Sequence, residues 1–147
     1  MNPSTGYIYV RNHPSYDEYD AYKLGKASNI PDRDTQYATG EIKRGHFEAV
    51  FELQIQHMGI AERLLQNEFR ELNVKFDAGT EFYNKKIITL IEPYLNTLDI
   101  KYKKLSNEEI TALVRCRRVK NNMKKINVSS LIRMLKSMSS NQPSVSY

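Results

Sequence analysis

Two tyrosine-bearing stretches and one arginine near the start of this 147-residue chain have the chemistry of a site that cuts phosphodiesters. The first stretch, residues 6–10, reads Gly-Tyr-Ile-Tyr-Val, and the second, residues 22–25, reads Tyr-Lys-Leu-Gly. Arg33 follows Gly25 by eight residues. Two short strands that carry tyrosines, followed by an arginine on a helix, predict a site for phosphodiester hydrolysis.

That reaction sets demands which two residue types in the chain can meet. Hydrolysis needs a positioned water, charge neutralisation on the equatorial oxygens and stabilisation of the leaving oxygen. Arg33 can present a planar fork to a phosphate, which a lysine cannot imitate. Glu62 can hold one Mg²⁺ (or Mn²⁺) ion as a hard oxygen ligand, with waters completing the octahedron. We therefore expect Arg33 and Glu62 to be the principal groups of a one-metal site.

Three strands are expected to form the frame of this site. Residues 7–11 alternate aromatic and aliphatic side chains, and residues 21–25 are similarly β-prone. Residues 12–20 between them have turn chemistry, which predicts a β-hairpin with a long loop. Residues 47–55 alternate apolar and polar side chains, which is the period of a half-buried strand.

A short helix after the hairpin is expected to carry the arginine. Asn29 can cap this helix, Pro31 lies near its first turn, and Gly40 stands where a helix stop is expected. Arg33 and Tyr37 are four residues apart, so they share one face of the helix.

A second helix is expected over residues 60–72, where apolar side chains recur at helical spacing. Glu62 falls at the edge of the apolar stripe, so it can face a cleft while the helix stays packed. If the helix is rotated, Glu68 is the more buried acid and needs a partner. Residues 79–83 predict a turn and short strand, and a helix is expected from about Asn84, which Pro93 kinks or ends.

The last third of the chain is basic and helical in pattern. Ser106 and Glu109 form a capping-box signature ahead of an amphipathic helix, and residues 130–138 predict a shorter one. Residues 139–147 are rich in Ser, Asn, Gln and Pro and predict a mobile end. The cations that we expect to contact nucleic acid are Lys26, Arg115, Arg117, Arg118, Lys120, Lys124 and Lys125.

Charge is distributed unevenly along the chain, which has a net charge of +5. Residues 1–96 carry 11 Lys/Arg and 14 Asp/Glu, whereas residues 97–147 carry 11 Lys/Arg and 3 Asp/Glu. A basic tail on a near-neutral body is typical of a polyanion binder, most commonly of a nucleic-acid binder. A solvated basic face without a partner is the alternative.

Several classes of protein are excluded by composition. No run of 18 apolar residues occurs, and the first twenty residues lack the pattern of a secretory signal, so we expect an intracellular protein, cytoplasmic or in the host nucleus, without membrane association. One cysteine, Cys116, cannot form an internal disulfide. With three scattered histidines it gives no zinc-ligand spacing.

Taken together, the motifs over residues 6–95 resemble the GIY-YIG nuclease superfamily. Residues 22–26 (Tyr-Lys-Leu-Gly-Lys), 61–66 (Ala-Glu-Arg-Leu-Leu-Gln) and 81–83 (Glu-Phe-Tyr) look closest to the branch common in phages and large DNA viruses. The resemblance implies an endonuclease in which Tyr9 orients or deprotonates the attacking water, supported by Tyr37.

Three positions depart from the superfamily pattern. Gly6 stands one place early for the first motif, and Gln66 replaces a histidine. Lys23 occupies the slot of the second tyrosine, as a phosphate contact or as part of the proton-transfer machinery. Tyr22 is then expected to face the opposite side of its strand. These departures favour, as an alternative function, a weak or inactive GIY-YIG-fold protein that binds DNA, is architectural or is virion-associated through protein contacts of its C-terminal helices.

Each candidate residue also has a structural interpretation. Tyr9 is an ordinary strand residue, and Arg33 can form a surface ion pair with a neighbouring aspartate. Glu62 can be a solvated helix residue, and Lys23 and Lys26 can be strand-edge lysines.

The predicted architecture is an α/β (α+β) fold with a small, mainly antiparallel, three-stranded sheet flanked by helices. We expect a nuclease-like domain over residues 1–96, a basic helical extension over residues 97–138 and a flexible tail over residues 139–147.

Overall fold

The computed structural model describes residues 4–115 and 132–137. Its strands are β1 (Thr5–Asn12), β2 (Ala21–Ala27), β3 (His46–Gln54), β4 (Phe82–Asn84) and β5 (Tyr102–Lys104). Its labelled α-helices are α1 (Ile30–Thr39), α2 (Ile55–Glu68) and α3 (Ile91–Thr97), and its 3₁₀ turns are η1 (Pro14–Tyr19), η2 (Arg70–Leu72) and η3 (Lys85–Thr89). Two more helical segments cover residues 107–115 and 132–137.

The strands form one antiparallel sheet in the order β4-β2-β1-β3-β5. The expected fold class is thus confirmed, but the sheet has five strands where three were predicted. The two additional strands, β4 and β5, are three residues each and form the edges. β4 overlaps the short strand expected within residues 79–83, which was not counted as part of the sheet, whereas β5 was not expected. Three residues are too few for an alternating pattern, and it is the pairing with β3 that makes β5 a strand.

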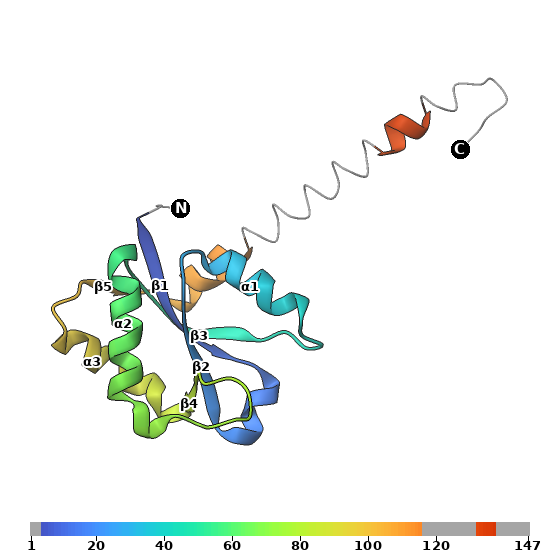
Figure 1. Ribbon diagram of the computed structural model, residues 1–147. Coiled ribbons are helices and arrows are strands. Elements are labelled where there is room, and N and C mark those ends of the chain that lie inside the picture. The colour runs from blue at the N-terminus through green and yellow to red at the C-terminus, as the bar shows by residue number, and fades with distance from the viewer. Residues whose placement is uncertain (1–3, 116–131, 138–147) are drawn as a thin grey trace.

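Each face of the sheet is covered by its own hydrophobic core, because side chains alternate along β1. Ile8 and Val10 pack with residues of α2 and α3. Tyr7 and Tyr9 pack on the other face with Ile30 of α1 and with the segment from Leu105 to Val114. Figure 1 shows α2 and α3 on one side of the sheet and α1 on the other. The chain beyond residue 96 therefore supplies both a strand and part of a core.

Local capping signals agree with the structure. The side chain of Asn29 accepts a hydrogen bond from the amide of Asp32 at 2.9 Å, and Gly40 ends α1. Ser106 and Glu109 form the reciprocal capping box, with both hydrogen bonds at 3.1 Å. These caps satisfy amides that a helix start leaves without internal partners.

Two helix boundaries differ from the prediction. Helix α2 begins at Ile55, directly after β3, and ends at Glu68, whereas residues 60–72 were expected to be helical. The expected helix from Asn84 is instead the end of β4, then η3, then α3. Pro93 lies in the first turn of α3, where its missing N–H leaves no hydrogen bond unmade, so it neither kinks nor ends the helix.

Over residues 4–115 and 132–137, no helix is both long enough and apolar enough to cross a membrane.

Candidate active site

The ring of Tyr9 lies directly over Gly25. The two residues are partners in the β1–β2 ladder, and both are buried. A Cβ atom built on Gly25 would stand 2.5 Å from the Cζ and hydroxyl oxygen of Tyr9, which is far inside van der Waals contact. Because Gly25 has no side chain, it leaves room for the ring of Tyr9.

Helix α1 brings a second phenol to the same place. The hydroxyl oxygens of Tyr9 and Tyr37 are 2.6 Å apart, and their rings meet edge to face with centroids 6.2 Å apart. Burial is the main cause that raises the pKa of Tyr9, and the hydrogen bond to Tyr37 adds to it, while Arg33 acts in the opposite direction. Tyr9 therefore holds its proton at neutral pH.

Lys23 points to the same face of the sheet as this tyrosine pair. It stands opposite Arg11 in the ladder, and its Nζ is 5.0 Å from the ring centroid of Tyr37 and 3.5 Å from the Oε2 of Glu81. Burial acts to lower the pKa of Lys23, but Tyr37 and Glu81 outweigh burial and the pKa is raised. Lys23 is thus a stable cation. Tyr22 packs against the core on the other face, as strand alternation predicted.

Arg33 lies one helical turn before Tyr37 on α1. Its Nη2 donates a hydrogen bond of 3.2 Å to the backbone carbonyl of Lys26, at the end of β2. Its charge acts to lower the pKa of both Tyr9 and Glu62. The guanidinium is therefore close enough to act electrostatically on one candidate residue from β1 and one from α2.

Glu62 on α2 is the half-buried acid of this region. Its side chain is 14% exposed, and its Oε1 is 3.6 Å from the Nζ of Lys26. Burial raises the pKa of Glu62, and Lys26 counteracts part of that effect. Glu68, the alternative if the helix were rotated, is exposed. Because Lys26 offsets only part of the effect of burial, a further cation close to Glu62 would stabilise its carboxylate.

One carboxylate of this region, that of Glu62, could serve as a ligand of a hard cation. No group of three or more His, Cys, Asp or Glu side chains in residues 4–115 and 132–137 is arranged to hold a metal ion. Mg²⁺ often takes one protein carboxylate, keeps several waters and completes its shell with substrate phosphate oxygens. Glu62 is the residue that would hold such an ion.

The structure thus brings Tyr9, Lys23, Arg33, Tyr37 and Glu62 into one region, together with Lys26. Arg115 lies elsewhere, in an open groove of about 680 Å³ that also includes Asp34, His46 and Val114 and includes none of those six residues. The other predicted nucleic-acid contacts, Arg117, Arg118, Lys120, Lys124 and Lys125, lie outside the described residues.

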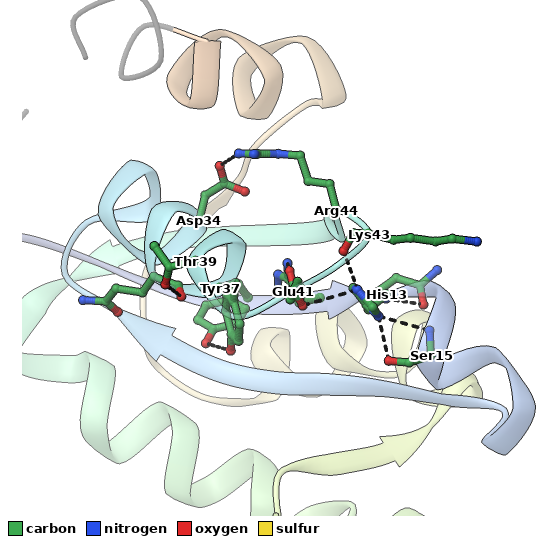
Figure 2. Close-up of polar contacts among 12 residues, drawn as sticks. His13, Ser15, Asp34, Tyr37, Thr39, Glu41, Lys43 and Arg44 are labelled. Carbon is green, nitrogen blue, oxygen red and sulfur yellow. Dashed lines mark hydrogen bonds and ion pairs between the residues drawn. The ribbon is translucent and has the colours of Figure 1, made fainter. Parts of the chain in front are cut away.

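Two residues in contact with this region were not anticipated. Arg11 is fully buried and donates to both carboxylate oxygens of Glu41, at 2.9 and 2.6 Å. Figure 2 shows Glu41 in the loop after α1, beside Tyr37 and His13. The alternation of Tyr7, Tyr9 and Arg11 along β1 places the arginine on the site face, and this signal was available in the sequence. Glu41 has no comparable local signal.

Comparison with known families adds an independent finding. The family model of the T5orf172 domain matches residues 6–116, a span that holds all five candidate catalytic residues, all of β2 to β5, and β1 from its second residue. No curated protein and no solved structure gives a significant match. The chain therefore belongs to the T5orf172 domain family, which is associated with nuclease-like or DNA-binding proteins of phage and viral type.

Proposed function

We propose that the chain is a DNA endonuclease of the GIY-YIG type that hydrolyses phosphodiester bonds with one divalent metal ion, Mg²⁺ or Mn²⁺. The observation that carries this proposal is the tyrosine pair over Gly25, with hydroxyls 2.6 Å apart. Arg33 acts electrostatically on both Tyr9 and Glu62, and Arg33 and Glu62 share Lys26 as a contact.

Charge neutralisation at the phosphate falls to Arg33 and Lys23. Arg33 offers a planar fork of N–H donors to two phosphate oxygens. Lys23 has a raised pKa, so it serves as a phosphate contact rather than as a proton acceptor. Of the two roles that the sequence left open for Lys23, this one agrees with the electrostatics.

The tyrosines orient the water. Tyr9 is protonated at neutral pH, so its oxygen accepts a hydrogen bond from the attacking water through a lone pair. As the new P–O bond forms and the bond to the leaving oxygen breaks, the water's proton passes to bulk water, and the leaving oxygen takes a proton from bulk water. Tyr37 fixes the direction of the Tyr9 hydroxyl because one of the two hydroxyls donates a hydrogen bond to the other. Orientation of a reactant by groups already in place lowers the barrier because little order remains to be imposed during reaction.

Glu62 would hold the metal ion beside Arg33. When bound, the ion supplies Lewis-acid stabilisation of the charge on the phosphate and leaving oxygens. The Nζ of Lys26 lies 3.6 Å from this carboxylate, so the lysine and the ion would compete for it. DNA phosphate can draw Lys26 away, which leaves the carboxylate to the metal.

A plasmid-nicking assay tests the proposal. Wild type should nick supercoiled plasmid with Mg²⁺ and not with EDTA, and Arg33→Ala and Glu62→Gln should each slow nicking by about 10²–10³-fold. Glu68→Gln is the matched control, since Glu68 is an exposed acid on the same helix. Calorimetry with Mn²⁺ should show binding to wild type and Glu68→Gln and none to Glu62→Gln. Metal-independent cleavage, or full activity in both site variants, would contradict the proposal.

The second candidate is a DNA-binding protein of the same fold without turnover. Lys23 in a tyrosine slot and the protonated state of Tyr9 favour it. Its DNA affinity would come from phosphate contacts and fall steeply with salt. The same experiment separates the candidates, because binding to plasmid without metal-dependent nicking supports this second function. DNA is the expected partner in both cases.

A further inference from the structure

Arg11 is a fully buried cation that the catalytic roles above leave unused. It follows Tyr9 by two positions on β1, and its side chain is 0% exposed. Both Nη atoms donate to the carboxylate of Glu41, whereas its Nε has no hydrogen-bond partner among the described residues. A buried ion pair is weak evidence for stability, because desolvation offsets much of the attraction. The geometry around Arg11 points to another use.

The guanidinium of Arg11 lies against the ring of Tyr37. Its Cζ is 3.9 Å from the ring centroid, within the range of a cation–π contact. The hydroxyl at the far end of that ring makes the 2.6 Å hydrogen bond to Tyr9. Arg11 therefore contacts the body of the phenol whose tip contacts the candidate water-orienting residue.

The loop after α1 fixes the guanidinium in this place. A Cβ on Gly45 would lie 2.7 Å from the Nη2 and 2.8 Å from the Cζ of Arg11, so the backbone of the loop passes directly over it. His13 supports Glu41 at 3.6 Å and the carbonyl of Lys43 at 2.6 Å, as Figure 2 shows. The carboxylate of Glu41 and the backbone at Gly45 thus hold the guanidinium of Arg11 against the ring of Tyr37.

We propose that Arg11, clamped by Glu41, is a positioning residue that sets the orientation of Tyr37 and, through it, of the Tyr9 hydroxyl. The proposal rests on the proposed nuclease function for its effect on rate, but its effect on the Tyr37 ring is independent of that function. Lysine cannot replace Arg11, because a point-like ammonium neither forks to the carboxylate nor stacks flat on a ring.

Kinetics provide the first test. Arg11→Lys should lower the single-turnover rate by about 10–100-fold and leave the KM for DNA within about twofold, because only the geometry of the chemical step changes. Arg44→Ala is the matched control. Arg44 ties the same loop to Asp34 and does not contact Tyr37, so its rate should stay within about twofold of wild type.

A double-mutant cycle separates positioning from a general structural effect. Once Tyr37→Phe has removed the hydroxyl, Arg11→Lys should slow the reaction no further, since residues that act as one unit are not additive. An equal slowing in both backgrounds would overturn the proposal.

NMR of protein with ¹³C-labelled tyrosine rings gives a readout without DNA. The Tyr37 resonance, assigned with Tyr37→Phe, should shift in Arg11→Lys and in Glu41→Gln, while the resonance of Tyr94, in the opposite core, stays in place. Glu41→Asp, which keeps the negative charge but shortens the side chain that holds Arg11, should also shift the Tyr37 resonance and keeps the test decisive if Arg11→Lys or Glu41→Gln does not fold. An unmoved Tyr37 resonance refutes the proposal. If the Tyr37 resonance shifts in the variants but wild type does not cleave DNA, the nuclease function is refuted and Arg11 remains the residue that orients Tyr37.

Discussion

The Nζ of Lys26 lies 3.6 Å from the carboxylate of Glu62, although the two residues come from a strand and a helix that are far apart in the chain. The lysine is 45% exposed and the glutamate 14% exposed, so the cation reaches solvent while the acid does not. One side chain is thereby available both to the acid and to a phosphate from solution. The Glu62 carboxylate and a DNA phosphate are expected to compete for Lys26, so DNA binding should favour metal binding at Glu62.

Lys26→Ala should have opposite effects on metal binding and on DNA binding. Loss of the lysine removes a group that lowers the pKa of Glu62, and it also frees the carboxylate for a metal ion. We expect tighter Mn²⁺ binding by calorimetry, with DNA affinity reduced and the slope of log K against log salt smaller by about 0.9. Lys101→Ala, at an exposed site next to β5, should change neither quantity. Weaker Mn²⁺ binding in Lys26→Ala would contradict this account.

Gly25→Ala should destabilise the fold at the tyrosine pair. The added methyl group would stand 2.5 Å from the Tyr9 ring in a buried site, and forced overpacking of this kind costs about 1–3 kcal/mol. Gly40→Ala is the matched control, because a Cβ there meets no atom within 4 Å and its φ is −106°. Urea unfolding measures both. Equal unfolding midpoints for the two variants would contradict the prediction, because they would show that the Tyr9 ring moves aside without a loss of stability.

Glu41→Gln should reduce stability in a pH-dependent way. Burial tends to raise the pKa of Glu41, but its hydrogen bonds with Arg11 outweigh burial and lower the pKa below the ordinary value of a glutamate. A depressed carboxyl pKa contributes stability that is complete above the unfolded-state pKa and is lost as pH falls through the folded-state pKa. The variant lacks that contribution at neutral pH and leaves Arg11 unpaired, at a cost of about 3–5 kcal/mol.

Thermal unfolding from neutral pH down to about pH 3 checks this expectation. Wild type and Glu41→Gln should differ most at neutral pH and converge at the acid end. Glu48→Gln is the control, because its partner His46 is 62% exposed, and its effect should stay within about 0.5 kcal/mol. A gap between wild type and Glu41→Gln that does not change with pH would refute the role of the Glu41 charge.

The basic tail should account for salt-sensitive DNA binding. Five cations, Arg117, Arg118, Lys120, Lys124 and Lys125, are to be changed together to Gln. The slope of log K against log salt should become smaller by about 0.9 for each phosphate contact that is lost. A variant with the exposed body cations Arg70 and Lys86 changed to Gln should keep the wild-type slope. If the tail variant binds DNA as tightly as wild type, these five cations do not contribute to DNA binding.

The sequence predicted local features of this fold well, since neighbouring residues determine them. Asn29, Gly40 and the Ser106–Glu109 capping box act within one helical turn, and the alternation along β1 follows from the pleat of a single strand. The facing directions of Tyr22 and Lys23 could be deduced in the same way.

Features that depend on distant pairing could not be derived in this way. β5 is a strand because β3 offers it hydrogen-bonding groups, although its own three residues include two lysines. The contact of Arg11 with Glu41 joins residues 30 positions apart, through a loop whose path no local pattern determines. The gathering of Tyr9, Tyr37 and Glu62 likewise depends on how two helices pack on opposite faces of the sheet.

The central place of β1 has a consequence for motion in the candidate site. β1 is bonded along its length to β2 on one side and to β3 on the other, whereas Glu81 precedes a three-residue edge strand and Glu62 is carried by a packed helix. Residues bonded on both sides move least, because a displacement must break two ladders at once. Tyr9 is therefore expected to move least in the region, so any adjustment to the proposed DNA substrate should come from the groups around it.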